Sequence, residues 1–219
     1  SLKMETFMAD GDPISHGDIA FVVSGSSLSI LKAERLILNA MQRMSAIATK
    51  TRRFVNLLKP YQTQILDTRK TTPGFRVLEK QAVKIGGGTN HRFALYDMVM
   101  LKDNHIDFAG GISQAIKKAT AYLDAHHLDL KIVVEARSVE EVEQILKYHD
   151  SVYRILLDNF DFESTRKAVQ IIDGRCLTES SGGITLKTAI PYAECGVDFI
   201  SSGALTHSVY NLDLSLKAM

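Results

Sequence analysis

The stretch KIVVEARSVEEVEQILKYHDSVYRILLDN, residues 131–159, contains two short apolar runs separated by an amphipathic segment. The runs 131–136 and 154–159 are rich in Ile, Val and Leu, and each carries a carboxylate near its end. Between them, residues 138–149 place apolar side chains at helical spacing. This pattern predicts two parallel strands joined by a crossover helix. Because both strands look apolar on either face, we expect helices to cover the sheet.

The same unit recurs on both sides of this stretch. Similar runs, each ending in a polar residue, occupy 64–70, 99–104, 175–180 and 198–203. With one polar marker per run, the successive steps are 33, 33, 23, 21 and 22 residues; the markers are Arg69, Lys102, Glu135, Asp158, Glu179 and Ser201. Six units without a glycine-rich dinucleotide fingerprint favour a barrel over a doubly wound sheet. We therefore predict an α/β fold built as a six-stranded, TIM-like barrel.

The two ends of the chain have a different pattern. Residues 18–23 read as a strand, and helical spacing then continues to about residue 58. The final stretch, 209–219, alternates apolar and polar residues and predicts a half-buried strand that packs with the N-terminal elements. We expect residues 1–58 with 208–219 to form a small second domain, and residues 59–207 to form the barrel.

Composition excludes several classes of function. The 219 residues are 45% hydrophobic, which is enough for a substantial core, and the net charge is +1. Near neutrality gives no general attraction to nucleic acid or to a membrane surface, and no apolar run approaches the roughly 20 residues of a membrane span. The only cysteines, Cys176 and Cys195, form no disulfide or zinc pattern, so we expect a reducing, cytoplasmic environment.

The predicted strand ends place charged groups on one face, because functional groups of a parallel barrel gather at the carboxyl ends of its strands. Arg69, Lys70 and Lys102 come from the first two units, and Glu135 and Asp158 from the next two. The cations suit an anionic substrate with several carboxylate or phosphate groups. The carboxylates suit either Mg²⁺ or ribose hydroxyls and a developing positive charge.

Two glycine-containing loops follow the last two strands. Ser181-Gly182-Gly183 and the segment 201–208 would present free N–H groups to a phosphate. A third glycine-rich segment, 84–92, ends in His91 and Arg92. It fits either the end of a helix or a mobile flap that carries these two side chains over an anion.

Several motifs, in this order, resemble those of the quinolinate phosphoribosyltransferase family. They are AERLILNAMQRMSAIAT (33–49), TRKTTPGFR (68–76), GGGTNHRFALYDMVMLKDNH (86–105), VVEA (133–136), LLDN (156–159), ESSGGI (179–184) and ISSGALTHS (200–208). The resemblance extends from about residue 10 to the C-terminus and implies an open α/β barrel with an α/β sandwich domain. It further implies a homodimer and the conversion of quinolinate and phosphoribosyl pyrophosphate to nicotinate mononucleotide, pyrophosphate and CO₂, a step of NAD synthesis.

The resemblance also implies roles for the residues that match these motifs. Those that would bind the carboxylates of quinolinate are Arg69, His91, Arg92 and Lys102. Those that would hold phosphoribosyl pyrophosphate are Lys70, Ser181, Gly182, Ser201 and Gly203, with His207 close to them.

Three further positions take roles from the resemblance. Glu135 and Asp158 would face the ribose and Mg²⁺, and together with Lys102 they would form the catalytic group. Arg35 would reach the substrate from the partner subunit of the dimer. From the sequence alone, Arg35 beside Glu34 reads as surface charge.

The sequence departs from the family pattern at a few positions. Val133 stands where a second acidic residue is common, Ala46 replaces a glycine, and Ser180 replaces an alanine. The family's leading N-terminal segment has no counterpart before residue 1, so we expect a partial sandwich domain.

Three other functions fit parts of the same pattern. A related phosphoribosyltransferase that acts on nicotinate would need fewer cations. A Schiff-base aldolase would use Lys70 or Lys102, and a non-catalytic homologue would bind anions without turnover.

Overall fold

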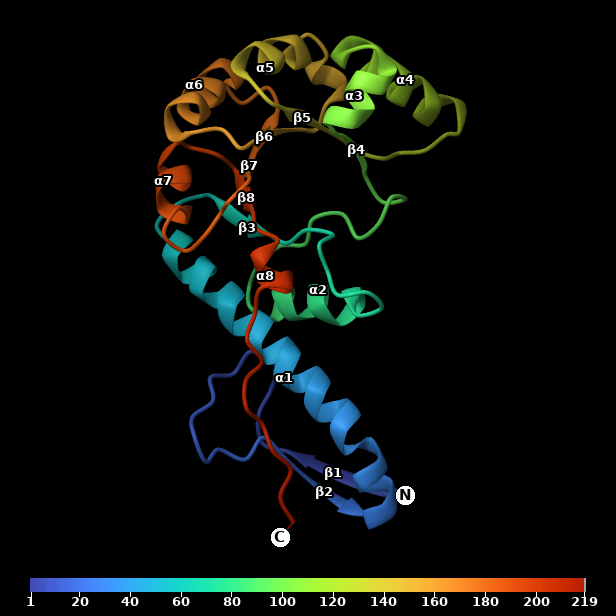
Figure 1. The fold of residues 1–219 in the computed structure, drawn as a ribbon, viewed down its shortest axis with the longest axis vertical. Coiled ribbons are helices and arrows are strands. Elements are labelled where there is room, and N and C mark those ends of the chain that lie inside the picture. The colour runs from blue at the N-terminus through green and yellow to red at the C-terminus, as the bar shows by residue number, and fades with distance from the viewer. Residues whose placement is uncertain (219) are drawn as a thin grey trace.

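A computed structural model describes residues 1–218 (Figure 1). The strands are β1 (Leu2–Thr6), β2 (Phe21–Gly25), β3 (Gln64–Leu66), β4 (Val99–Leu101), β5 (Ile132–Ala136), β6 (Arg154–Asp158), β7 (Leu177–Ser181) and β8 (Phe199–Ser201). The helices are α1 (Ser27–Leu58), α2 (Arg76–Ile85), α3 (Asp103–Ala109), α4 (Ile112–Ala125), α5 (Val139–Leu146), the 3₁₀ turn η1 (His149–Ser151), α6 (Phe162–Ile172), α7 (Ala189–Glu194) and α8 (Ala204–His207).

Six strands form one parallel sheet in the order β3-β8-β7-β6-β5-β4. This confirms the prediction of six parallel strands with crossover helices. The sheet curves around a central space and helices α3 to α7 lie on its outer side (Figure 1). Its register places Glu135 opposite Leu156, and Asp158 opposite Ser181. The carboxyl ends of neighbouring strands therefore meet at one rim.

The two edge strands, β3 and β4, are separated by the loop that follows α2. Thr89 of this loop donates its N–H to the carbonyl of Ile65 at 3.0 Å and accepts from the N–H of Asp67 at 3.2 Å. These bonds form a single parallel bridge between Leu66 and Thr89. The loop thus occupies the exposed edge of β3, where a further strand would otherwise pair.

Strand alternation divides the side chains between two environments. Ile155, Leu157 and Val134 are fully buried in the apolar core, which they share with residues of α4, α5 and α6. The positions between them point to the other face, and there Arg154 and Glu179 are also buried, with 5% and 0% exposure. The expectation of strands that are apolar on both faces is therefore wrong for β6 and β7, whose inner faces carry these two charged side chains. The two can be buried because they neutralise each other in an ion pair.

The N-terminal part differs from the sheet region. Helix α1 begins after Ser26, whose hydroxyl accepts from the N–H of Ser29, and its end at Leu58 confirms the prediction. Strand β2 starts at Phe21, three residues after the predicted start, and pairs antiparallel with β1, which the sequence did not indicate. No helix within residues 1–218 is long and apolar enough to cross a membrane.

The final segment does not form the predicted strand. Residues 209–218 have no strand assignment and run alongside α1 (Figure 1). There the side chain of Gln42 donates to the carbonyl of Leu214 at 2.8 Å, and the carbonyl of Gln42 accepts from Leu212 at 3.3 Å. Because a helix uses its main-chain groups internally, it can accept a single extra bond, as at Gln42, but it cannot offer a continuous ladder to a neighbouring extended segment.

Candidate active site

The rim of the sheet carries a fixed carboxylate at Asp158. The hydroxyl of Ser181 donates to Oδ1 of Asp158 at 2.6 Å, and Nδ2 of Asn159 donates to Oδ2 at 2.6 Å. The bond from Ser181 arises because β6 and β7 end side by side, whereas Asn159 directly follows Asp158 in the chain. Each oxygen of Asp158 therefore has a donor of its own, and the carboxylate is held in one orientation.

Glu135 lies close to Asp158 at the same rim. Its side chain is buried, and this burial raises the pKa of Glu135, with a further increase from the charge of Asp158. The positive charge of Lys102 lowers the pKa of Glu135. The main-chain N–H of Lys102 donates to Nδ1 of His105 at 3.0 Å. The structure thus brings together Lys102, Glu135 and Asp158, the three predicted catalytic residues.

A metal ion would find two carboxylates here. Within residues 1–218, no group of three or more His, Cys, Asp or Glu side chains is arranged as a metal cage. Mg²⁺ is commonly bound through one or two carboxylates together with substrate phosphates and water. Burial raises the pKa of Glu135, the charge of Asp158 raises it further, and a cation between the two carboxylates would relieve this repulsion. The donor set therefore fits Mg²⁺ that arrives with a phosphorylated substrate.

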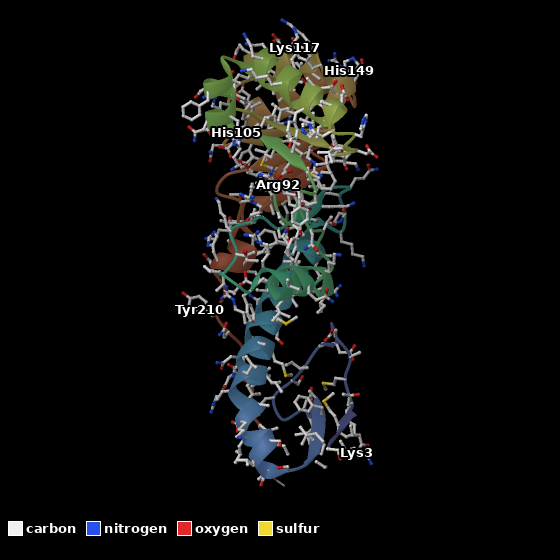
Figure 2. The ribbon with its side chains drawn as sticks, turned by 90° about the vertical axis from the view of Figure 1, so that its right-hand side faces the viewer. Lys3, Arg92, His105, Lys117, His149 and Tyr210 are labelled. Carbon is white, nitrogen blue, oxygen red and sulfur yellow. The ribbon has the colours of Figure 1, made fainter. Side chains whose placement is uncertain are left out.

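Two arginines on the loops after β3 and α2, Arg69 and Arg92, lie close enough for their charges to interact. Arg92 is buried, and its Nη1 donates to the carbonyl of Met98 at 3.1 Å. Burial lowers the pKa of Arg92, and so does the positive charge of Arg69. Figure 2 shows Arg92 near the middle of the long axis, away from Lys3 at the N-terminal end. Like charges held this close favour an anion between them.

His91 is fixed by contacts on all sides. Its N–H donates to Oδ1 of Asp67 at 2.8 Å, and its carbonyl accepts from Nζ of Lys80 at 3.0 Å. Its ring Nδ1 accepts from the N–H of Arg92 at 2.7 Å, and its Nε2 lies 3.2 Å from Oε2 of Glu179. The structure shows the first of the two alternatives for segment 84–92, because this segment begins with the end of helix α2.

The glycines of that segment allow α1 to approach α2 closely. Gly86 is the C-cap of α2, and a Cβ atom there would lie 2.5 Å from the carbonyl oxygen of Ala48. The close packing at this loop therefore requires glycine, which has no Cβ atom, at position 86.

The predicted phosphate loops come together in part. A Cβ atom on Gly203 would lie 3.0 Å from Cδ of Lys70 and 3.0 Å from Cδ2 of His207, so these three residues adjoin one another. The hydroxyl of Thr206 donates to the carbonyl of Lys70 at 2.8 Å, which ties the loop after β3 to the start of α8. Ser201, at the end of β8, is buried.

Gly182 has a backbone conformation that residues with a side chain rarely adopt. Its φ of +93° is in the left-handed region, and a Cβ atom would lie 2.1 Å from Oδ1 of Asn159. Because Asn159 also donates to Asp158, the glycine makes room for a residue that orients the rim carboxylate.

Arg35 is the one predicted site residue that lies apart in this chain. It lies in the first half of α1 with 77% of its side chain exposed, and Glu34, at 3.9 Å, is its ion-pair partner within residues 1–218. Arg43, two turns later and about 12 Å along the helix axis, is the α1 residue that reaches α2, where it binds Glu79 at 2.9 Å.

The sequence did not indicate several charged residues that are buried, namely Asp67, Glu79, Lys80 and Arg154, or the partly buried Arg43 that pairs with Glu79. For Arg154 a signal existed, because it shares a strand face with Asp158, four residues later. For Glu79 and Lys80 there was none: they are buried in α2 while the neighbouring Val77 is 66% exposed.

Comparison with known proteins gives a consistent result. Residues 47–217 match the family described as quinolinate phosphoribosyl transferase, C-terminal domain, and residues 1–45 match its N-terminal domain. A mitochondrial quinolinate phosphoribosyltransferase [decarboxylating] of Nicotiana glauca is 46% identical over 99% of this chain and 65% of its own length. A probable nicotinate-nucleotide pyrophosphorylase [carboxylating] of Bacillus subtilis is 44% identical over 94% of this chain and 70% of its own.

Solved structures agree with these sequence matches. NadC from Streptococcus pyogenes has a TM-score of 0.92 and 39% identity, over 99% of this chain and 75% of that one. The nicotinate-nucleotide pyrophosphorylase from Francisella tularensis has a TM-score of 0.90 and 40% identity, over 98% of this chain and 74% of that one. The chain spans 65% of the length of the Nicotiana relatives that it matches.

Proposed function

The chain belongs to the quinolinate phosphoribosyl transferase family, and from this premise we propose that it transfers phosphoribose to quinolinate in NAD synthesis. The products are nicotinate mononucleotide, pyrophosphate and CO₂. The observation that carries the proposal is that the rim of the sheet holds the carboxylates Glu135 and Asp158 with the ammonium group of Lys102, and that Arg92 and Arg69 interact on loops of the same domain. Such a site offers cations to a dicarboxylate and anions to a developing positive charge.

Quinolinate binds to the cationic side in this proposal. Arg69, Arg92 and Lys102 neutralise its two carboxylates, and His91 lies beside Arg92. Arg92 is well suited because it is buried, and a guanidinium in a dry setting binds a carboxylate more strongly than one in water. A substrate with one carboxylate would leave part of this positive charge unmatched.

Phosphoribosyl pyrophosphate binds along the loops after β3, β7 and β8. The residues proposed to hold its phosphates are Lys70, Ser181, Gly182, Ser201, Gly203 and His207. Support comes from the contact among Lys70, Gly203 and His207, which brings a cation and a histidine to one loop with little side-chain bulk.

The chemistry follows from this placement. The bond between ribose C1 and pyrophosphate breaks, and Glu135 and Asp158 stabilise the oxocarbenium-like centre that forms. Mg²⁺, when bound through these carboxylates and the phosphates, would neutralise charge on the departing pyrophosphate. The pyridine nitrogen attacks C1, and its new positive charge accepts the electron pair released as the adjacent carboxylate leaves as CO₂. The pyridine carbon then takes a proton.

A homodimer completes the site in this proposal, with Arg35 of a second copy reaching the quinolinate. Within one chain Arg35 is exposed and pairs with its neighbour Glu34 in the first half of α1. The large apolar side chains around it are exposed as well, with 66% for Leu31 and 77% for Leu36. An apolar face of this kind around a charged residue suits burial against another chain.

We also propose that the chain forms an open barrel and part of a sandwich domain. The curved sheet with separate edges at β3 and β4 suits an open barrel formed by residues 59–207. The antiparallel pair β1-β2, with α1 beside it, suits part of an α/β sandwich formed by residues 1–58 with 208–219. A cytoplasmic location stays a prediction, since plant relatives carry mitochondrial or chloroplastic names.

The test is a coupled product assay on the full-length protein. With quinolinate, phosphoribosyl pyrophosphate and Mg²⁺, we expect equal amounts of CO₂ and nicotinate mononucleotide. Nicotinate in place of quinolinate is the control for the related transferase, and we expect little product from it. Binding of both substrates without product would support a non-catalytic anion-binding homologue instead.

A further inference from the structure

The two ring nitrogens of His91 both face protein groups. Nδ1 accepts the main-chain N–H of Arg92 at 2.7 Å, so the ring proton is on Nε2. Nε2 lies 3.2 Å from Oε2 of Glu179, although the contact is too poorly aligned to count as a hydrogen bond. The side chains of His91 and Glu179 are 5% and 1% exposed. Nδ1 is therefore occupied, whereas Nε2 lies against Glu179 without a hydrogen-bond partner among residues 1–218.

Glu179 is itself held firmly from the opposite side. Nη1 of Arg154 donates to the same Oε2 at 2.7 Å, and the guanidinium of Arg154 lies 4.2 Å from the ring centre of Phe199. Burial favours the neutral acid, but the contacts with His91 and Arg154 outweigh it and keep the pKa of Glu179 below its ordinary value. Glu179 is thus an anion fixed on β7 inside the curved sheet.

These contacts form a line from the interior to the site: Arg154, Glu179, the ring of His91, and the N–H of Arg92. We infer that Glu179 is a positioning residue that keeps the His91 ring in its Nε2–H form, so that Nδ1 stays available to accept the main-chain N–H of Arg92. The inference rests on the proposed function, since it concerns how the proposed quinolinate-binding residue Arg92 is placed. Histidine oriented by a carboxylate in this way keeps one tautomer.

The alternative is that His91 becomes a doubly protonated cation when it meets the carboxylates of the substrate. In that form both ring nitrogens carry protons, and Nδ1 could no longer accept from Arg92. The bond that fixes the main chain of Arg92 would be lost when the substrate binds. The two possibilities differ in the protonation of one ring nitrogen, which can be observed.

The first experiment is ¹⁵N NMR of the histidine side chains in the full-length protein, with the His91 signals assigned from their loss in His91→Gln. We expect Nε2 of His91 to be protonated and Nδ1 to be unprotonated near neutral pH, both without ligand and with quinolinate added. Protonation of Nδ1 in either state would overturn the inference. Because no turnover is needed, this result is independent of whether the proposed reaction occurs.

The second experiment separates positioning from folding. Glu179→Gln alone would leave Arg154 buried without an anion, so the variant to use is the double change Arg154→Met with Glu179→Gln. We expect the KM for quinolinate to rise about tenfold to a hundredfold, with the KM for phosphoribosyl pyrophosphate and kcat changed far less, since a small displacement of Arg92 is enough for such a loss.

A matched control is available on the surface. Arg137 and Glu141 form an Arg–Glu pair at 2.8 Å that is partly exposed, so Arg137→Met with Glu141→Gln removes the same two charges away from His91. We expect wild-type kinetics from it. An unchanged quinolinate KM in the folded Arg154→Met, Glu179→Gln protein would overturn the inference.

Discussion

Nζ of Lys80 lies 2.5 Å from Oδ1 of Asp67, and the two side chains are 4% and 0% exposed. The pair joins α2 to the residue that follows β3, and it bonds both the N–H and the carbonyl of His91. Burial raises the pKa of Asp67 and lowers the pKa of Lys80, while each charge favours the other. One buried ion pair therefore fixes the loop that carries His91 and Arg92.

Loss of one member of this pair should destabilise the protein. Lys80→Met leaves the Asp67 carboxylate buried without a cation, and we expect the free energy of unfolding to fall by about 3–5 kcal/mol. Lys84→Met, on the exposed face of the same helix, should change it by less than about 0.5 kcal/mol. Urea denaturation of the two variants checks this. Equal stability would mean that the pair contributes nothing net.

Removal of the Glu135 charge should stabilise the protein and impair it as an enzyme. The pKa of Glu135 is raised in the folded state, so its ionisation opposes folding once the pH exceeds the ordinary value of about 4.3. Glu135→Gln should therefore raise the free energy of unfolding by about 0.5–2 kcal/mol near neutral pH. Product formation should fall strongly.

The pH dependence gives the control for this prediction. At about pH 3, well below the ordinary carboxyl pKa of about 4.3, both states hold the proton and the advantage of Glu135→Gln should vanish. Thermal unfolding of the wild type and the variant at the two pH values measures it. An advantage that is larger at low pH would contradict the assignment.

Arg92 and Asp158 should affect different kinetic constants. Arg92→Ala removes a buried partner of a quinolinate carboxylate, and we expect the KM for quinolinate to rise about tenfold or more. Asp158→Ala should chiefly lower kcat, because its charge acts on the transition state. Arg53→Ala, an exposed arginine of α1, is the control. Small, equal effects at Arg92 and Asp158 would show that the site has been misplaced.

Gly182 should tolerate a methyl group less well than another glycine with positive φ. Gly174→Ala, at φ +69° with no atom of residues 1–218 within 4 Å of the new Cβ, should show only the backbone cost of about 1–2 kcal/mol. Gly182→Ala must also displace Asn159, so we expect a larger loss of stability and a higher KM for phosphoribosyl pyrophosphate. Thermal unfolding and steady-state kinetics of the two proteins make the comparison.

A site shared between subunits predicts complementation. Arg35→Ala and Lys102→Ala should each give an inactive full-length protein. After unfolding and refolding together, an equal mixture should regain about a quarter of the wild-type activity, since half of the dimers are mixed and each of these has one intact site. No recovery in a preparation shown to contain mixed dimers would place Arg35 outside the active site.

The sequence alone determined that there are six strands, that they run parallel, and that the charged residues at their ends meet at one rim. Apolar runs of strand length followed by polar markers carry that information locally, because side chains alternate along a strand and parallel strands end together. The same pattern predicts the position of Lys102, Glu135 and Asp158 at the ends of their strands. The structure of segment 209–218 could not be predicted, since an alternating pattern does not say whether the neighbour is a strand or a helix.

Only the tertiary structure decided which charges are buried. Lys80 meets Asp67 across 13 residues, and Arg154 meets Glu179 across 25. A charge can leave water only where a partner from elsewhere in the chain compensates the loss of hydration, so burial at one position depends on a residue that local sequence does not indicate. The same limit applies to Arg35, whose proposed role depends on a second copy of the chain.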